Sequence, residues 1–84
     1  MKINDYVIIM FDKDSIRGTK IIKIKNTTIG NEIWGYWHNL LNKKLKLDFF
    51  YENKKSGNGG MRLATIKEKN LIKKLDEMIF AEAL

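Results

Sequence analysis

The chain has 84 residues, with 16 lysines and arginines against 10 aspartates and glutamates, which gives a net charge of +6 at pH 7. It has no cysteine and only one histidine, so disulfides, thiolate metal sites and clusters of imidazoles are excluded. A chain of this length has room for one small core, and we expect residues 1–84 to form a single domain. The apolar run at residues 6–11 is too short for a membrane span or a signal peptide, which predicts a cytoplasmic protein that does not enter membranes.

The positive charge attracts anionic partners such as nucleic acid or acidic protein surfaces. All of the basic residues except Arg17 and Arg62 are lysines, however. Lysine is a point charge without the bidentate geometry that marks specific recognition of phosphate or guanine. The lysine-rich coding of a low-GC genome explains the same charge, so charge alone does not identify a partner.

The first half of the chain predicts three strands. Residues 6–11 are continuously apolar, as is typical of a central strand that is buried on both faces. Residues 12–18 hold aspartate, serine and glycine, which favour a hairpin turn. Residues 19–25 then alternate isoleucine with lysine, and a second turn leads to the third predicted strand at residues 32–38.

Residues 44–51 show the clearest period-two alternation of the chain. Leu45, Leu47, Phe49 and Tyr51 share one face, and polar residues take the other face, apart from Phe50. We expect the face of Leu45 to be the inner one. A loop rich in glycine separates this strand from a short one at residues 61–64.

Residues 66–82 predict an amphipathic helix. Thr65 and Glu68 have the spacing of a capping box at its start. Five apolar residues fall on one arc of the helix and are expected to pack on the sheet. They are Leu71, Ile72, Leu75, Met78 and Ile79. Phe80 points away from this arc and is the residue through which the helix would form a homodimer.

Several strands followed by one terminal helix predict a mainly β, α+β domain. Ile3–Ile8, the turn that ends at Gly18 and Ile21–Ile24 resemble the opening of SH3-like small barrels, with Asn4 in place of the family's glycine. Arg62–Glu68 resembles the strand-to-helix ending of many short phage and mobile-element proteins. The resemblance implies a small antiparallel SH3-like barrel, or a curled five-stranded sheet, closed by the helix. Such barrels include nucleic-acid binders, peptide binders and inhibitors.

No motif in the chain predicts catalysis or a metal site. A calcium loop that began at Asp12 would need a further oxygen ligand where Ile16 stands. His38 is the only imidazole, and a general base needs a positioned nucleophile or water and an orienting group. A small basic ribonuclease-like toxin that uses His38 is therefore a minor alternative to a protein without enzymatic activity or cofactor.

The loop at residues 52–60 superficially resembles a phosphate-binding loop. In a P-loop the glycines precede the lysine and a helix follows at once. Here Lys54 and Lys55 precede the glycines and a strand follows. We interpret the segment as a basic loop that contacts a partner.

The predicted strand at residues 32–38 carries an aromatic cluster. Trp34, Tyr36 and His38 alternate onto one face, and Ile33 and Trp37 take the other. If the first set is exposed, it fits either a stacking platform for single-stranded nucleic acid or a protein interface. The same rings fit a packed core equally well, and the sequence leaves core and surface open.

The sequence therefore predicts a small non-enzymatic binding protein of phage or mobile-element type. One concrete form is an inhibitor that occupies the surface of a host defence macromolecule, whose expected partner is a host protein with an acidic surface or a nucleic-acid-handling site. The alternative is direct binding of DNA or RNA. The predicted binding residues are Trp34, Tyr36, His38, Lys23, Lys25, Lys44, Lys46, Lys54 and Lys55.

Overall fold

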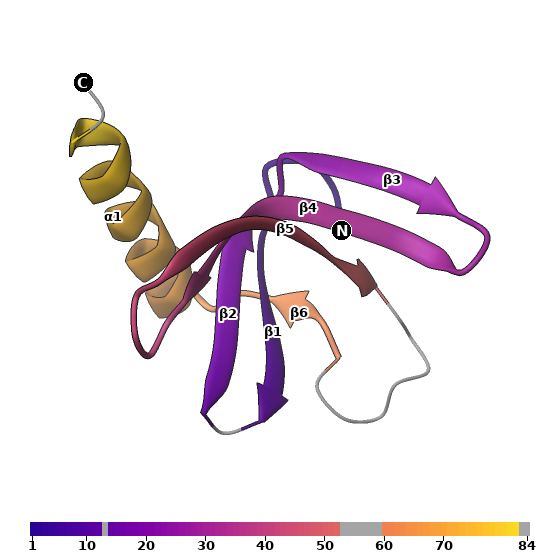
Figure 1. The fold of residues 1–84 in the computed structure, drawn as a ribbon, viewed down its shortest axis with the longest axis horizontal. Helices are drawn as coiled ribbons and strands as arrows, with labels where there is room; N and C mark the ends of the chain where they lie inside the picture. The colour runs from indigo at the N-terminus through magenta and orange to yellow at the C-terminus, as the bar shows by residue number, and fades with distance from the viewer. Residues whose placement is uncertain (13, 53–59, 83–84) are drawn as a thin grey trace.

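A computed structural model of the chain describes residues 1–12, 14–52 and 60–82, which form an antiparallel, curled sheet with a helix at one end (Figure 1). The elements in chain order are β1 (Tyr6–Asp12), β2 (Ser15–Lys20), β3 (Lys23–Thr27), β4 (Gly30–Asn39), β5 (Leu45–Glu52), β6 (Arg62–Leu63) and α1 (Ile66–Glu82). This arrangement confirms the predicted mainly β fold with a terminal helix. The bounds of α1 are those predicted from the sequence.

The longest strand, β4, organises the sheet. One of its edges pairs with β5, and the other pairs first with β3 and then with β2. β2 and β3 therefore act as one bent strand. When they are counted as one, the sheet has five strands and is curled, as expected. On the far side of β2 lie β1 and the short β6.

The prediction of a single strand at residues 19–25 is wrong, because the strand is interrupted at Ile21 and Ile22. The amide of Ile21 donates to the carbonyl of Asp5 at 2.9 Å, whereas the amide of Ile22 donates to the carbonyl of Trp34 at 2.9 Å. The chain thus changes its hydrogen-bonding neighbour within two residues. Ile21 is fully buried at this bend, where it joins the core.

The turn predicted at residues 12–18 is also shorter than expected. Asp12 already pairs with Ser15, so residues 15–18 belong to β2. Gly18 lies under the helix and not in the turn. A Cβ atom on Gly18 would lie 2.7 Å from the Cδ1 atoms of Ile8 and Ile72, so this glycine allows α1 to approach the sheet.

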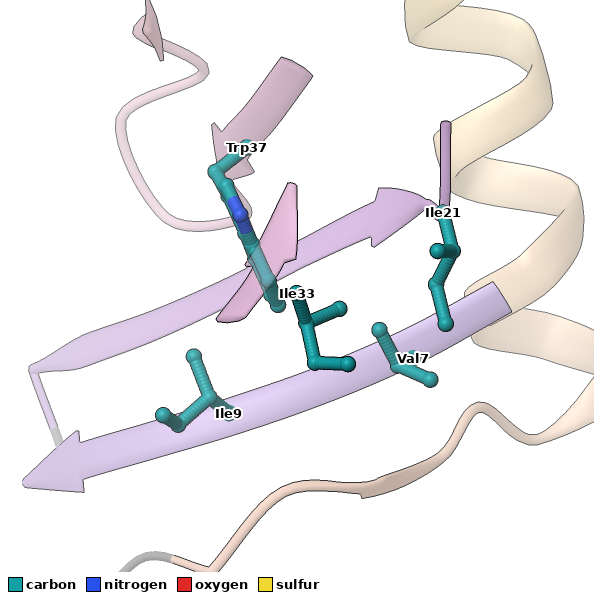
Figure 2. Packing of buried hydrophobic residues seen from close by; sticks show 5 residues of the cluster. All are labelled: Val7, Ile9, Ile21, Ile33 and Trp37. Carbon is teal, nitrogen blue, oxygen red and sulfur yellow. The ribbon is translucent and has the colours of Figure 1, made fainter. Parts of the chain in front are cut away.

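The hydrophobic core fills the concave side of the sheet. Figure 2 shows its buried cluster, which comprises Val7, Ile9, Ile21, Ile33 and Trp37. Phe50, Ile24 and Met61 pack against this cluster. Burial of such side chains is the main source of stability for a small domain.

The faces of β5 are inverted relative to the prediction. Phe50 pairs with Ile33 and therefore points with it into the core. Since neighbouring residues of a strand point to opposite sides, the face of Leu45, Leu47, Phe49 and Tyr51 lies outside. Leu47 is 51% exposed and Tyr51 is 37% exposed.

α1 covers one end of the convex side. Among the side chains of residues 66–79, Ile72 and Leu75 are buried, and Leu71 and Ile79 are half-buried. Met78, which was predicted to face the sheet, is 54% exposed because it lies at the margin of the covered arc. The side chain of Phe80 lies outside the described residues, and the homodimer expected through it stays a prediction.

The start of α1 has the predicted capping box. The amide of Thr65 donates to Glu68 Oε1 at 2.9 Å, and the amide of Glu68 donates to Thr65 Oγ1 at 3.2 Å. Arg62 adds two hydrogen bonds to the same carboxylate, at 2.7 and 2.8 Å. These contacts join β6 to the helix, and the Arg62 guanidinium together with Thr65 lowers the pKa of Glu68 to about 2.

We expect Glu68→Gln to lower the free energy of unfolding at pH 7 by about 1 kcal/mol, a value reduced for the exposure of Arg62 to solvent. The pKa of this carboxyl falls from 4.5 to about 2 on folding, so its stabilisation is present above pH 4.5 and is lost as the pH falls toward 2. Urea unfolding of wild type and variant across this range measures the difference. Glu77→Gln, on an exposed position of the same helix, is the control. A wild-type advantage that stays constant from pH 7 to pH 2 would contradict this account.

Gly35 marks the closest approach between β4 and the bent strand β2–β3. A Cβ atom at this position would collide with the Thr19 hydroxyl and lie 2.8 Å from the Lys20 carbonyl oxygen. We expect Gly35→Ala to destabilise the fold by about 3 kcal/mol, because a backbone oxygen cannot move aside. Gly18→Ala is the matched comparison and should cost about 1 kcal/mol, since the tips of Ile8 and Ile72 can rotate away. Equal losses in urea unfolding would show that Gly35 is not a packing constraint.

Candidate functional site

The convex side of β3, β4 and β5 carries a surface that we call the outer aromatic face. It consists of Trp34, Tyr36, Leu47, Phe49 and Tyr51. Trp34 pairs with Phe49 across β4 and β5, and Tyr36 pairs with Leu47. These side chains point away from the core because their neighbours Ile33, Trp37 and Phe50 point into it.

The rings of this face pack against one another. The ring centroids of Trp34 and Phe49 are 4.6 Å apart with a tilt of 34°, and those of Phe49 and Tyr51 are 5.5 Å apart and nearly perpendicular. The indole Nε1 of Trp34 donates a hydrogen bond of 3.0 Å to Glu32 Oε1. These contacts fix the rings before any partner binds.

The helix leaves most of this face uncovered. α1 packs on β1 and β2 at one end of the sheet, away from β3 and from the far ends of β4 and β5 (Figure 1). Leu47 and Tyr51 are therefore exposed, and Trp34, Tyr36 and Phe49 are half-buried. The question that the sequence left open is thus answered for Trp34 and Tyr36, which lie at the surface.

Two of the predicted lysines border the outer aromatic face. Lys23 pairs with Trp34 and Lys25 pairs with Glu32, and both lysines are exposed. The ammonium of Lys23 lies 5.8 Å from the centroid of the Trp34 ring, within the range of a cation–π contact. The structure therefore brings Lys23 and Lys25 to the border beside Trp34, and Tyr36 lies two residues further along the same face of β4.

His38 does not belong to this surface. It continues the alternation of Trp34 and Tyr36, but it lies where α1 covers the sheet and it is fully buried. Its Nε2 lies 2.5 Å from Asp76 Oδ1 of the helix. Its other ring nitrogen, Nδ1, has no hydrogen-bond partner among the described residues. This geometry indicates a structural link between β4 and α1.

Tyr36 also lines a pocket of about 340 Å³ between α1 and the sheet. Tyr6, Asp76 and Glu77 contribute to the same pocket. Burial, together with the carboxylates of Asp76 and Glu77, raises the pKa of Tyr6. Lys20 and Lys73 line the same pocket, so two cations balance the two carboxylates and the pocket favours neither sign of ligand charge.

Lys44 and Lys46 lie on the other side of the sheet from the outer aromatic face. Lys46 pairs with Trp37, whose ring belongs to the core side, and both lysines line a pocket of about 310 Å³ there. Lys46 also forms a 3.7 Å ion pair with Asp48. Lys54 and Lys55 lie outside the described residues, so their predicted contact with a partner stays a prediction.

Three residues of the outer aromatic face were not predicted as binding residues. Leu47, Phe49 and Tyr51 were assigned to the core, because alternation alone does not say which face of a strand is buried. The available signal was Phe50, the one apolar residue among the polar positions of β5. Reading Phe50 as core would have placed the other three outside.

The described residues include no group of three or more histidine, cysteine, aspartate or glutamate side chains placed to hold a metal ion. Within the same residues, no helix is long and apolar enough to cross a membrane. Comparisons with protein-family models, with curated proteins and with solved structures find no match. The arguments for function therefore come from the geometry of this chain.

We expect His38 and Asp76 to stabilise the fold as a pair. His38→Ala and Asp76→Ala should each destabilise the protein, and the double variant should lose about 1–2 kcal/mol less than the sum of the two, as contacting residues do. Urea unfolding of the four proteins measures this coupling. Glu77→Ala combined with His38→Ala is the control and should be additive. If the losses of stability from His38→Ala and Asp76→Ala were additive, the two side chains would not form a structural pair. His38 would then be a candidate catalytic residue of the ribonuclease-like toxin.

Proposed function

We propose that the chain is a protein-binding domain and that it binds through the outer aromatic face. The observation that carries the proposal is the preformed cluster of Trp34, Phe49 and Tyr51 beside the exposed Leu47. Tryptophan and tyrosine supply most of the binding energy in many protein interfaces, because they combine a large apolar area with few rotatable bonds. A cluster that is already ordered loses little entropy on binding.

The ring arrangement favours a protein partner over nucleic acid. Bases stack on ring faces that are free, whereas Trp34 contacts Phe49 and lies near the ammonium of Lys23. The buried carboxylate of Glu32 holds the indole N–H, so a negative charge lies inside the surface, where it would repel phosphates. These features suit an apolar protein surface better than a nucleic-acid backbone.

The charges around the face indicate the chemistry of the partner. Lys23 and Lys25 lie at its border, and the chain carries a net charge of +6. A second copy of the chain would bring like charges together, which disfavours a homodimer through this face. We infer a different protein, with an apolar patch flanked by aspartate or glutamate.

The proposed mode of action is occupation of the partner's surface without catalysis. An inhibitor of a host defence protein would act in this way, by covering the surface of that protein. This role agrees with the phage-type resemblance of Arg62–Glu68. Phage origin and inhibition rest on that resemblance and are part of the proposal. So is the absence of enzymatic activity.

We expect Leu47→Asp to weaken partner binding strongly without unfolding the domain. Leu47 is exposed, so its replacement should leave thermal unfolding close to wild type. A charge at the centre of an apolar contact should weaken binding about 30-fold or more, as loss of a hot-spot residue does. Affinity capture from bacterial lysate, followed by titration of the purified partner, measures the effect.

Leu63→Asp is the matched control, because Leu63 is an exposed leucine of β6, outside the proposed surface. It should bind as the wild type does. Failure to recover a stoichiometric partner, or equal binding by Leu47→Asp and Leu63→Asp, would overturn the proposal. Binding of DNA or RNA that falls steeply with salt would instead support the nucleic-acid alternative.

A further inference from the structure

A polar pocket lies on the concave side of the sheet, separate from the outer aromatic face. It is a pocket of about 310 Å³ at the end where β2, β4 and β5 meet. Arg17 of β2 pairs with Asn39 of β4, and Trp37 of β4 pairs with Lys46 of β5, so the four side chains share one side. The residues that line the pocket are Arg17, Trp37, Asn39, Asn42, Lys44, Leu45 and Lys46.

Two buried N–H groups of this pocket's residues lack an acceptor. Trp37 is 1% exposed, and its indole Nε1 has no hydrogen-bond partner among the described residues. The same holds for Nε of Arg17. Buried donors without an acceptor are rare and unfavourable in native proteins, so the fold leaves polar groups of this pocket's residues unsatisfied.

The charge of the pocket has one sign. Among the described residues, Arg17, Lys44 and Lys46 line it and no carboxylate does. Aromatic rings hold the Arg17 guanidinium, which lies 5.8 Å from the centroid of Phe11 and 5.9 Å from that of Phe50. Lys46 forms a long, exposed ion pair with Asp48. Such a pair is weak, so the Lys46 ammonium can still attract an anion in the pocket.

The turn between β4 and β5 holds the pocket in shape. Asn39 Oδ1 accepts from the amides of Leu41 and Asn42, and Asn42 Oδ1 accepts from the amide of Lys44 at 3.0 Å. Lys43 takes the left-handed conformation, with φ of 61°, that closes this turn. Lys44 is therefore presented from an ordered turn.

From these observations we infer that the pocket of Arg17, Trp37, Lys44 and Lys46 binds a phosphate group. Three cations offset the double negative charge of phosphate, and its oxygens would accept from the exposed ammonium groups of Lys44 and Lys46 and from the guanidinium of Arg17. A carboxylate offers one charge and two oxygens, and so fits this set of donors less well. The phosphate is either the free ion or part of a small phosphorylated ligand such as a nucleotide.

The two tryptophans give the experiment an internal control. In a ¹H–¹⁵N spectrum each indole N–H gives its own signal, and Trp34 already donates to Glu32 on the opposite side of the sheet. Titration with inorganic phosphate at constant ionic strength should shift the Trp37 signal with saturation and leave the Trp34 signal in place. The same titration with uridine 5′-monophosphate distinguishes the sources, since tighter binding than that of inorganic phosphate assigns a phosphorylated organic ligand.

Variants assign the effect to the pocket. Arg17→Gln should weaken binding about tenfold or more, because it removes a charge-assisted donor. Lys44→Gln, at an exposed position that leaves folding unaffected, should weaken it about two- to fivefold. Lys25→Gln removes the same charge from the convex side and should have no effect. A Trp37 signal that does not move, a linear drift of both indoles, or equal losses for Lys44→Gln and Lys25→Gln would overturn the inference.

Discussion

The pairing of β4 with strands on both of its edges determines which side chains form the core and which form the surface. Its register sets Ile33 beside Phe50 and Trp34 beside Phe49, so one choice decides both the core and the surface. A shift of one residue would exchange the two faces of β5. Gly35 permits this arrangement, because it lets the bent strand β2–β3 pass close to the middle of β4.

The same strand supplies three separate environments. Ile33 and Trp37 belong to the core, Trp34 and Tyr36 lie on the open convex side, and His38 is sealed under α1 against Asp76. The helix thus divides one alternating run of aromatic residues into a structural part and an exposed part. The exposed part, bordered by Lys23 and Lys25, is the surface that we assign to a protein partner.

Local sequence signals predicted the parts of the fold that depend on neighbours in the chain. The capping box of Thr65 and Glu68 placed the start of α1, and alternation placed β4 and β5. The burial of Gly18, the break at Ile21 and the inversion of β5 depend on contacts between distant residues, which periodicity does not report. Asn4 takes the left-handed backbone conformation, with a φ of 77°, which asparagine tolerates better than most residues other than glycine.

Trp34, Leu47, Phe49 and Tyr51 lie together on the outer side of the sheet, with Phe50 and Trp37 on the core side. Solution NMR with a soluble paramagnetic agent measures which of these side chains solvent can reach. We expect strong broadening of the Leu47 methyl and Tyr51 ring signals, weak broadening of Phe50 and Trp37, and nuclear Overhauser effects between the rings of Trp34 and Phe49. Strong broadening of Phe50 with protection of Leu47 would contradict this arrangement.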